Sequence, residues 1–247
     1  MAFGRGCKLY GRAMLAIFFS ILPGMKKYYF IFALAVLFGC KEKPQPLTQA
    51  ALQGVLTAYG KANPENRVTI KTSFGTIKLK LYEETPLHRA NFVKLIKEGY
   101  YENAEFYRIV YEFMIQGGDL SQKLNYRIPA EFNTKYFHKK GALSMARTDE
   151  NNPELQSSAA EFFIVHGQRY ADWDIDTEAR NNGLTLSAEQ RAAYLKEGGY
   201  MSLDTRYTVF GEVTEGLDVV DKIASQKVFN QDKPLQKIPF EITVSME

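Results

Sequence analysis

Cysteine is almost absent from this sequence of 247 residues. The two cysteines, Cys7 and Cys40, both lie in the N-terminal segment, and none follows them. The rest of the chain therefore has no disulfide framework, no cysteine-based zinc site and no thiol nucleophile. The hydrophobic share of 45% and the charged share of 24% are ordinary for a globular protein, so the chain is neither collagenous nor wholly disordered.

Histidine is nearly as rare, and the common nucleotide-binding and hydrolase motifs are missing. The chain has no G-x-G-x-x-G, no Walker loop, no H-E-x-x-H and no G-x-S-x-G. We expect His88 on the surface of a helix, His138 in a loop, and His166 at a strand end as a hydrogen-bonded residue rather than a catalytic base. The sequence thus indicates no metal site and no cofactor, and an enzyme of this sequence would act through binding and electrostatics.

Acidic residues are missing from residues 1–39, which contain five basic residues. The formal charge of +3 comes from this segment, because residues 40–247 carry 26 basic and 28 acidic residues. A nucleic-acid-binding protein needs a basic patch in its folded part. No long basic run follows residue 40, so we expect no nucleic-acid partner.

A short apolar run, residues 28–39, follows two lysines near the N-terminus. It is too short for a membrane-spanning helix, which needs about 20 residues. A basic start, a short apolar core and a cleavage site are typical of a secretory signal. Residues 37–40, Leu-Phe-Gly-Cys, resemble a bacterial lipobox, in which the signal is cut before the cysteine and the cysteine is acylated.

We therefore expect residues 25–39 to be a lipoprotein signal peptide and Cys40 to carry the lipid. Because a complete signal starts at Met25, residues 1–24 are expected to lie upstream of the true start. The lipid would hold the mature protein in the bacterial cell envelope, on the periplasmic side of the inner or outer membrane. The alternative is an apolar helix that anchors the chain without cleavage.

Residues 40–67 are expected to form a tether and a short helix ahead of the main domain. A polar stretch with two prolines suits the tether, and apolar residues then recur at helical spacing from Leu47 to Tyr59 and stop at Gly60. This pattern predicts an amphipathic helix with a packing role. The main domain is expected to span residues 68–247.

Short alternating runs dominate the main domain. Residues 68–71 and 77–81 flank a Ser-Phe-Gly turn and predict a hairpin. Further strands are expected at residues 106–110, 113–116, 142–146, 162–165, 207–213 and 240–245. Many short strands and few helices predict an all-β fold, either a sandwich or a barrel.

Two helices are expected among these strands. Thr85 as N-cap and Pro86 in the first turn predict a helix that ends at Gly99. The second helix is expected at residues 217–224, with Thr214 as its candidate cap.

Residues 170–201 depart from the strand rhythm, because they are polar and rich in Asp, Glu and Arg. Ser187 and Gln190 form a capping-box pair ahead of a short apolar pattern. These features predict an inserted loop with one helix of its own.

Residues 106–119, FYRIVYEFMIQGGD, are the most informative segment of the chain. Residues 141–147 (GALSMAR), 157–165 (SSAAEFFIV) and 203–213 (LDTRYTVFGEV) follow it in order. Together these segments resemble the cyclophilins, which are peptidyl-prolyl cis-trans isomerases, and the resemblance extends from Val68 to the C-terminus. It implies a closed eight-stranded antiparallel barrel, capped by two helices and interrupted by the insertion, and we expect a monomer.

The resemblance also implies the roles of individual residues. Arg108 matches the catalytic arginine, and Gln116 matches the glutamine that positions it and contacts the substrate backbone. The residues matching the apolar pocket for the proline ring are Phe113, Met114, Phe163 and Leu203. Ala146 matches a backbone contact to the residue before proline, and Tyr207 stands where the family often has a histidine in the pocket wall.

This chemistry needs little machinery. Amide resonance makes rotation about the X–Pro bond slow, with a barrier of roughly 18–20 kcal/mol. In the twisted transition state the proline nitrogen regains its lone pair, so a fixed donor aimed at that nitrogen, or at the substrate's carbonyl oxygen, stabilises that state more than the planar one.

The chain departs from the family pattern at several positions around this site, and Ala159 and Ala160 replace the common Gly and Ser. Glu161 stands where the family usually has glutamine and is expected among the substrate-binding residues; its carboxylate either pairs with Arg108 or faces solvent. Ser202 stands where cyclosporin-sensitive members have tryptophan, which implies weak cyclosporin binding. Arg147 resembles the bacterial form of the motif and is expected to border the substrate.

The leading hypothesis is a lipid-anchored isomerase that acts on X–Pro bonds of exported or envelope polypeptides and assists their folding. The alternative is a proline-peptide-binding chaperone or scaffold module with low turnover, suggested by Glu161 and the insertion. A nutrient-capturing lipoprotein is a third hypothesis, which only the anchor supports.

Overall fold

The computed structural model describes residues 47–121 and 123–246, which belong to the compact unit Gln45–Glu247. The predicted signal peptide, residues 25–39, and the predicted lipidation site Cys40 lie outside the described residues. No helix in the described part is both long enough and apolar enough to span a membrane.

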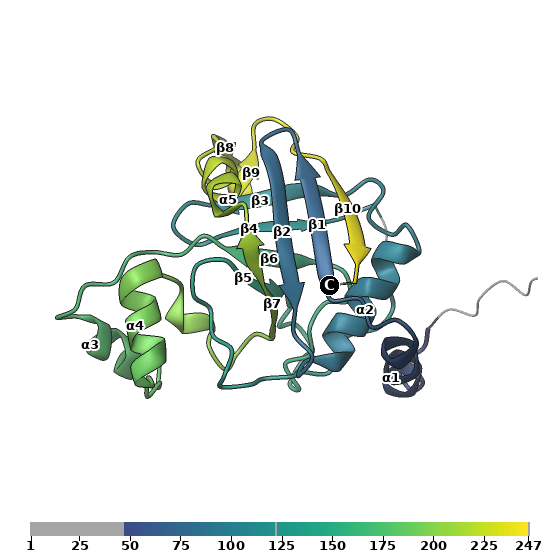
Figure 1. The fold of residues 1–247 in the computed structure, drawn as a ribbon, viewed down its shortest axis with the longest axis horizontal. Helices are drawn as coiled ribbons and strands as arrows, with labels where there is room; N and C mark the ends of the chain where they lie inside the picture. Colours follow the sequence, from purple (N-terminus) through teal and green to yellow (C-terminus); the bar gives the residue numbers. More distant parts are fainter. Residues whose placement is uncertain (1–46, 122, 247) are drawn as a thin grey trace, which may run out of the picture. The chain divides into compact units, whose positions relative to one another are not determined.

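Eight strands form one antiparallel sheet in the order β10-β1-β2-β7-β5-β6-β4-β3 (Figure 1). The strands are β1 (Arg67–Thr72), β2 (Gly75–Leu81), β3 (Glu105–Val110), β4 (Met114–Gly118), β5 (Ala142–Met145), β6 (Phe162–Val165), β7 (Val209–Glu215) and β10 (Phe240–Ser245). The predicted hairpin is confirmed, since β1 and β2 pair from Arg67 opposite Lys80 to Thr72 opposite Gly75. All eight predicted strand regions are therefore strands.

The sheet curls until its two edge strands meet. The amide of Phe106, in β3, donates to the carbonyl of Ile238 at 2.9 Å, and the amide of Phe240, in β10, donates to the carbonyl of Ala104 at 3.2 Å. An isolated bridge joins Glu105 and Pro239 between them. The predicted eight-stranded antiparallel barrel is thus confirmed, and its closure is this short bridge rather than a full ladder.

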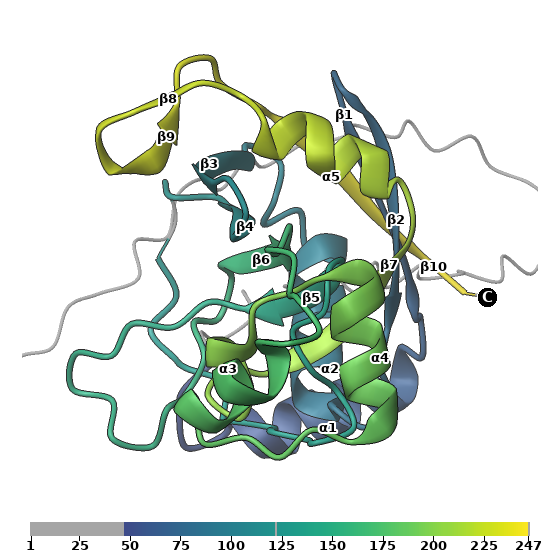
Figure 2. The same ribbon diagram turned by 90° about the vertical axis from the view of Figure 1, so that its left-hand side faces the viewer.

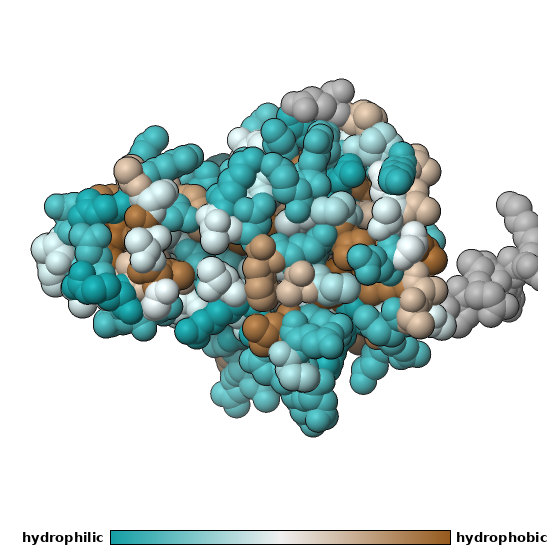
Figure 3. Space-filling model, turned by 90° about the horizontal axis from the view of Figure 1, so that it is seen from below, coloured by the Kyte–Doolittle hydropathy of each residue, from teal (hydrophilic) through white to brown (hydrophobic). Residues whose placement is uncertain are grey.

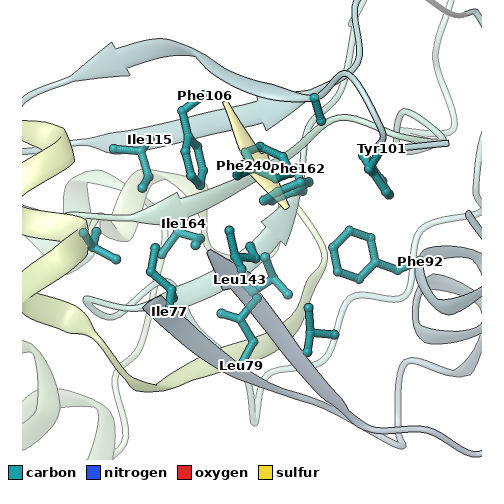
Figure 4. Close-up of a cluster of buried hydrophobic side chains, with 14 of the residues drawn as sticks. Ile77, Leu79, Phe92, Tyr101, Phe106, Ile115, Leu143, Phe162, Ile164 and Phe240 are labelled. Carbon is teal, nitrogen blue, oxygen red and sulfur yellow. The ribbon is translucent and has the colours of Figure 1, made fainter. Parts of the chain in front are cut away.

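Aromatic rings fill the interior of the barrel (Figure 4). Phe92 and Phe162 lie edge to face at 5.3 Å between ring centroids, and Phe106 packs on Phe240 at 4.9 Å. All four side chains are buried, and full burial of such a side chain stabilises the fold by about 1.5–3 kcal/mol. Burial alternates along β1 and β2, whereas β5 and β6 are buried at every position and helix α2 (Pro86–Lys97) adds Phe92 to the core.

Helices α2 and α5 (Leu217–Ala224) lie where the sequence predicts them, and Thr85 is the N-cap residue of α2 with Pro86 in its first turn, as predicted, whereas Thr214 as the cap of α5 is wrong. The side chain of Thr85 caps no helical amide; the Glu131 carboxylate instead accepts the amides of Leu87 at 3.0 Å and His88 at 2.9 Å. In α5, Gly216 with φ +92° is the N-cap, and the Thr214 hydroxyl donates to a carbonyl of β2. A long-range contact therefore replaces the local side-chain cap in α2, whereas in α5 a glycine takes the cap position.

Helix α1 (Leu52–Ala62) packs on α2, as predicted for the apolar stripe, although it begins five residues later than Leu47. Leu52 and Leu56 are fully buried in a small cluster with Leu87 of α2. Gly60 permits this approach, because a Cβ there would lie 3.0 Å from the Cβ of Ala90. The helix therefore forms part of the compact unit rather than of a free tether.

The insertion contains two helices, α3 (Ile175–Asn181) and α4 (Ala188–Glu197), followed by the 3-10 turn η1 (Met201–Leu203). The predicted capping box at Ser187 and Gln190 is confirmed, with bonds of 3.1 and 2.9 Å. Helix α3 was not expected, because its seven residues include only Ile175 and Ala179 as buried apolar groups.

The insertion has a small core of its own, consisting of Ile175, Ala179, Tyr194 and Met201. Its helices lie at the end of the compact unit opposite α1 (Figure 1). Seen from below, hydrophilic side chains cover most of the surface, and hydrophobic ones appear as small separate areas (Figure 3).

Candidate active site

Arg108 and Gln116 lie directly opposite each other on the antiparallel strands β3 and β4. The side chain of Arg108 is 40% exposed, so its guanidinium reaches the surface. A guanidinium stays charged and carries five N–H donors in a rigid plane. This pair of strands therefore presents a fixed line of donors at the edge of the barrel.

The six predicted pocket residues gather beside these strands. Met114, Ala146, Phe163 and Leu203 are buried in one apolar cluster, and the partly buried rings of Phe113 and Tyr207 pack against it. Phe163 and Tyr207 meet edge to face at 6.0 Å between ring centroids. Four separate parts of the chain supply these groups, so the cluster exists only in the folded barrel.

The backbone at Ala146 is held between two neighbouring segments. Its amide donates to the carbonyl of Glu161, and its carbonyl accepts the amide of Ser158, both at 2.8 Å. A carbonyl oxygen has a second lone pair, so a contact to a substrate amide is still available there.

Arg147 is fixed against the pocket wall. Its guanidinium carbon lies 4.3 Å from the centroid of the Tyr207 ring, and its Nε donates to Asp149 at 2.6 Å. The side chain also donates to the carbonyl of Arg206 and is only 8% exposed. This cation–π contact holds Tyr207 in place, and little of the arginine remains for a substrate.

Gln116 and Arg108 each bond to a partner that the sequence did not indicate. Gln116 Nε2 donates to the Tyr107 hydroxyl at 2.5 Å rather than contacting Arg108. Arg108 itself pairs with Asp232 through Nε and Nη2, both at 3.2 Å, so the alternative in which it pairs with Glu161 is wrong.

The physical reason for the first difference is a register shift in β3 between Phe106 and Arg108. Such a bulge leaves the residue between them unpaired and re-aims its side chain. Tyr107 is that residue, and burial followed by the nearby Glu161 charge raises the pKa of its phenol. A bulge leaves no mark in the sequence pattern, so this tyrosine was not identified from sequence; Asp232 was missed because it lies 124 residues from Arg108.

Two histidines lie in buried hydrogen-bond networks. His88 Nδ1 lies 2.6 Å from Glu131 Oε2, and its Nε2 lies 2.9 Å from the Ser157 hydroxyl. The expectation of a surface position for His88 is wrong, because the Glu131 cap draws this side of α2 inward. Its side chain is fully buried.

His138 follows the same pattern in its loop. Its Nδ1 lies 2.8 Å from Asp204 Oδ1, and its Nε2 lies 3.0 Å from the Ser144 hydroxyl. Asp204 also accepts the hydroxyl of Tyr194 at 2.6 Å. This network joins the insertion to the loop that carries Leu203.

His166 is hydrogen-bonded at the end of β6, as predicted, since its Nδ1 accepts the Glu112 amide at 3.0 Å. Burial, and secondarily the Lys140 charge, lower the pKa of its imidazole.

A hollow of about 1180 Å³ lies between the end of β2, the loop before β5 and α4. Tyr82, Tyr136 and Glu84 are among its lining residues, and none of the predicted site residues lines it. Within the described residues, no group of three His, Cys, Asp or Glu side chains is placed to hold a metal ion.

Comparisons with known proteins agree on one family. The family model for cyclophilin type peptidyl-prolyl cis-trans isomerases matches residues 67–244. A Staphylococcus epidermidis protein named "Putative peptidyl-prolyl cis-trans isomerase" is 31% identical over 185 residues, covering 72% of this chain and 90% of the relative.

A second relative is longer. The Streptococcus pyogenes protein named "Putative bifunctional phosphatase/peptidyl-prolyl cis-trans isomerase" is 37% identical over 187 residues, which cover 71% of this chain. The chain spans only 37% of the length of that relative.

Among solved structures, a Cryptosporidium parvum cyclophilin type isomerase superposes with a TM-score of 0.55 at 21% identity, covering 74% of this chain and 99% of its own. A second structure of that protein, determined in the presence of the dipeptide Ala-Pro, gives a TM-score of 0.54. At this identity the similarity establishes the fold.

Proposed function

This chain belongs to the cyclophilin-type peptidyl-prolyl cis-trans isomerase family, and we propose that Arg108 supplies its catalytic donor toward exported or envelope polypeptides. The observation that carries the proposal is the position of Arg108, which is 40% exposed and lies opposite Gln116, while Gln116 lies opposite Phe163 of the apolar cluster on the next strand. An apolar cluster beside a charged donor is what an X–Pro segment needs, because its ring is apolar and its nitrogen becomes basic only when the bond is twisted.

The mechanism follows from this arrangement. The proline ring packs on the partly exposed rings of Phe113 and Tyr207, which cover the cluster around Phe163, and this holds one side of the X–Pro bond still. Rotation of the other side removes amide resonance and returns the lone pair to the proline nitrogen. An N–H of Arg108 then bonds this lone pair, so the protein stabilises the twisted state more than either planar state. No covalent bond forms or breaks.

Proline-containing polypeptides are the substrates that suit this family. We propose that those encountered here lie outside the cytoplasm, and the support is the signal pattern at residues 25–39 with Cys40 behind it. Residues 41–46 separate Cys40 from the described part, and six extended residues reach at most about 20 Å. A lipid on Cys40 would therefore keep the isomerase close to a membrane surface.

The test of catalysis is the rate of cis-to-trans conversion of a short X–Pro peptide. Arg108→Ala should remove about 2–4 kcal/mol of transition-state stabilisation, roughly a 30- to 900-fold loss in kcat/KM. Arg169→Ala is the matched control, because Arg169 donates to the Lys196 carbonyl in the exposed insertion. Equal rates in wild type and Arg108→Ala would refute the proposal, and peptide binding without any acceleration would favour the scaffold alternative.

The test of the anchor is the mass of the mature N-terminus from membranes of an expressing bacterium. The proposal predicts a lipid-modified Cys40 and release of the protein into the soluble fraction on Cys40→Ser. An intact terminus at Met1 or Met25 would contradict it, whatever the isomerase assay shows.

A further inference from the structure

A small hairpin far along the chain contacts the proposed catalytic arginine. Strands β8 (Val228–Phe229) and β9 (Lys233–Pro234), with the turn η2 (Asn230–Asp232) between them, lie beside β3 (Figure 2). Asp232 Oδ2 accepts a hydrogen bond from Arg108 Nε at 3.2 Å and forms an ion pair with Nη2, also at 3.2 Å. The two residues are 124 positions apart, so this contact depends on the fold.

The backbone conformation of the turn holds the Asp232 carboxylate beside Arg108. Gln231 and Asp232 have φ values of +65° and +59°, in the left-handed region that residues other than glycine rarely adopt. Asp and Asn are the best tolerated of them there, which favours Asp at this position. The β8–β9 ladder and a 2.9 Å bond from the Leu235 amide to the Lys227 carbonyl hold the turn from both sides.

The bond leaves the guanidinium free to act. The hydrogen bond to the carboxylate occupies only Nε–H, and Nη2 lies 3.2 Å from the same oxygen as an ion-pair contact. The four N–H donors of Nη1 and Nη2 are left for a substrate. An unheld arginine of this exposure would sample many rotamers, and fixing the reacting group beforehand raises the rate.

We propose that Asp232 is a positioning residue that orients the Arg108 guanidinium toward the proline nitrogen, an inference that rests on the proposed role of Arg108. The carboxylate acts only through the arginine and does not touch the substrate. Its removal should therefore lower kcat and leave KM nearly unchanged.

Asp232→Asn is the informative variant, because asparagine also tolerates the left-handed turn but lacks the charge. We expect kcat to fall about fivefold, equivalent to about 1 kcal/mol, with KM within about twofold of wild type. Lys233→Gln, the next residue in the same hairpin, changes the local charge by one unit without touching Arg108 and should keep the wild-type kcat.

A double-mutant cycle and a spectrum separate positioning from a structural role. In the Arg108→Ala background, Asp232→Asn should cause no further loss, because its effect passes through the arginine. In the NMR spectrum of the folded protein, the Nε–H signal of Arg108 should shift and exchange faster with water in Asp232→Asn.

The outcomes distinguish the two proposals. If wild type is active and Arg108→Ala is not, but Asp232→Asn keeps the wild-type kcat or leaves the Nε–H signal unmoved, the positioning role is overturned and the catalytic arginine stands. A fivefold loss that persists in the Arg108→Ala background also overturns it. A wild-type protein without activity overturns the proposed function, and the positioning role with it.

Discussion

The two buried histidine networks and the Arg108–Asp232 pair have similar chemistry in opposite surroundings. His88 with Glu131, and His138 with Asp204, combine a carboxylate, an imidazole and a serine hydroxyl within 2.6–3.0 Å. Arg108 and Asp232 are each about two-fifths exposed. The first two resemble a hydrolytic triad in geometry, whereas the third looks like an ordinary surface ion pair.

Accessibility decides which of them can act on a substrate. Ser157 and Ser144 are 3% and 0% exposed, so no substrate carbonyl can approach either hydroxyl. The Ser144 hydroxyl also donates to the carbonyl of Thr208 at 2.8 Å. These networks therefore join loops to the barrel, and we expect variants in them to change stability, whereas variants at Arg108 change the rate.

The largest expected effect on stability is that of Asp204→Ala. It leaves three buried donors without an acceptor, namely the His138 amide, the His138 imidazole and the Tyr194 hydroxyl. We expect the free energy of unfolding, measured in urea, to fall by about 3–5 kcal/mol. Asp172→Ala is the control, since it removes an exposed partner of Arg191 in the same insertion. If the urea unfolding midpoint of Asp204→Ala equals that of Asp172→Ala, the buried network stabilises the fold no more than the exposed ion pair does.

Local patterns were predictable from the sequence, and contacts between distant segments were not. The capping box at Ser187 was found because both its members lie within four residues. Glu131 caps α2 from more than 40 residues away, and Asp232 reaches Arg108 across 124, so neither leaves a local signal.

The site shows the same division. The pocket residues and Arg108 were located through motif resemblance, and the structure brings them together. The predicted contact of Gln116 with Arg108 was wrong because a bulge redirects Tyr107 toward Gln116. A period-two pattern assumes that every strand residue is paired, so it does not predict a bulge.

A smaller effect is expected for Glu131→Gln, which tests the long-range cap. The glutamine side chain keeps one acceptor oxygen for the backbone N–H groups of α2. It loses the negative charge that faces three donors of Leu87 and His88. We expect a loss of about 1–2 kcal/mol in unfolding free energy, typical of a removed N-cap, with an unchanged kcat. Glu98→Gln, an exposed residue at the other end of α2, should leave the unfolding midpoint in place. A drop in kcat without a drop in stability would assign the network to the reaction instead.

The smallest effect is a pH dependence of stability that His166 introduces. This histidine belongs to neither of the two buried histidine networks. Burial and the Lys140 charge lower the pKa of the folded imidazole, while Asp221 and Glu112 oppose them. The unfolded chain, with a pKa near 6.5, then binds a proton before the folded one does. Stability is therefore full above about pH 6.5, falls as the pH drops below it, and levels off below the folded pKa. His166→Gln should flatten this part of the curve when unfolding free energies are compared between about pH 8 and pH 5. Identical curves for wild type and variant would mean that the imidazole is protonated equally in both states, and that the bond from the Glu112 amide does not hold it neutral.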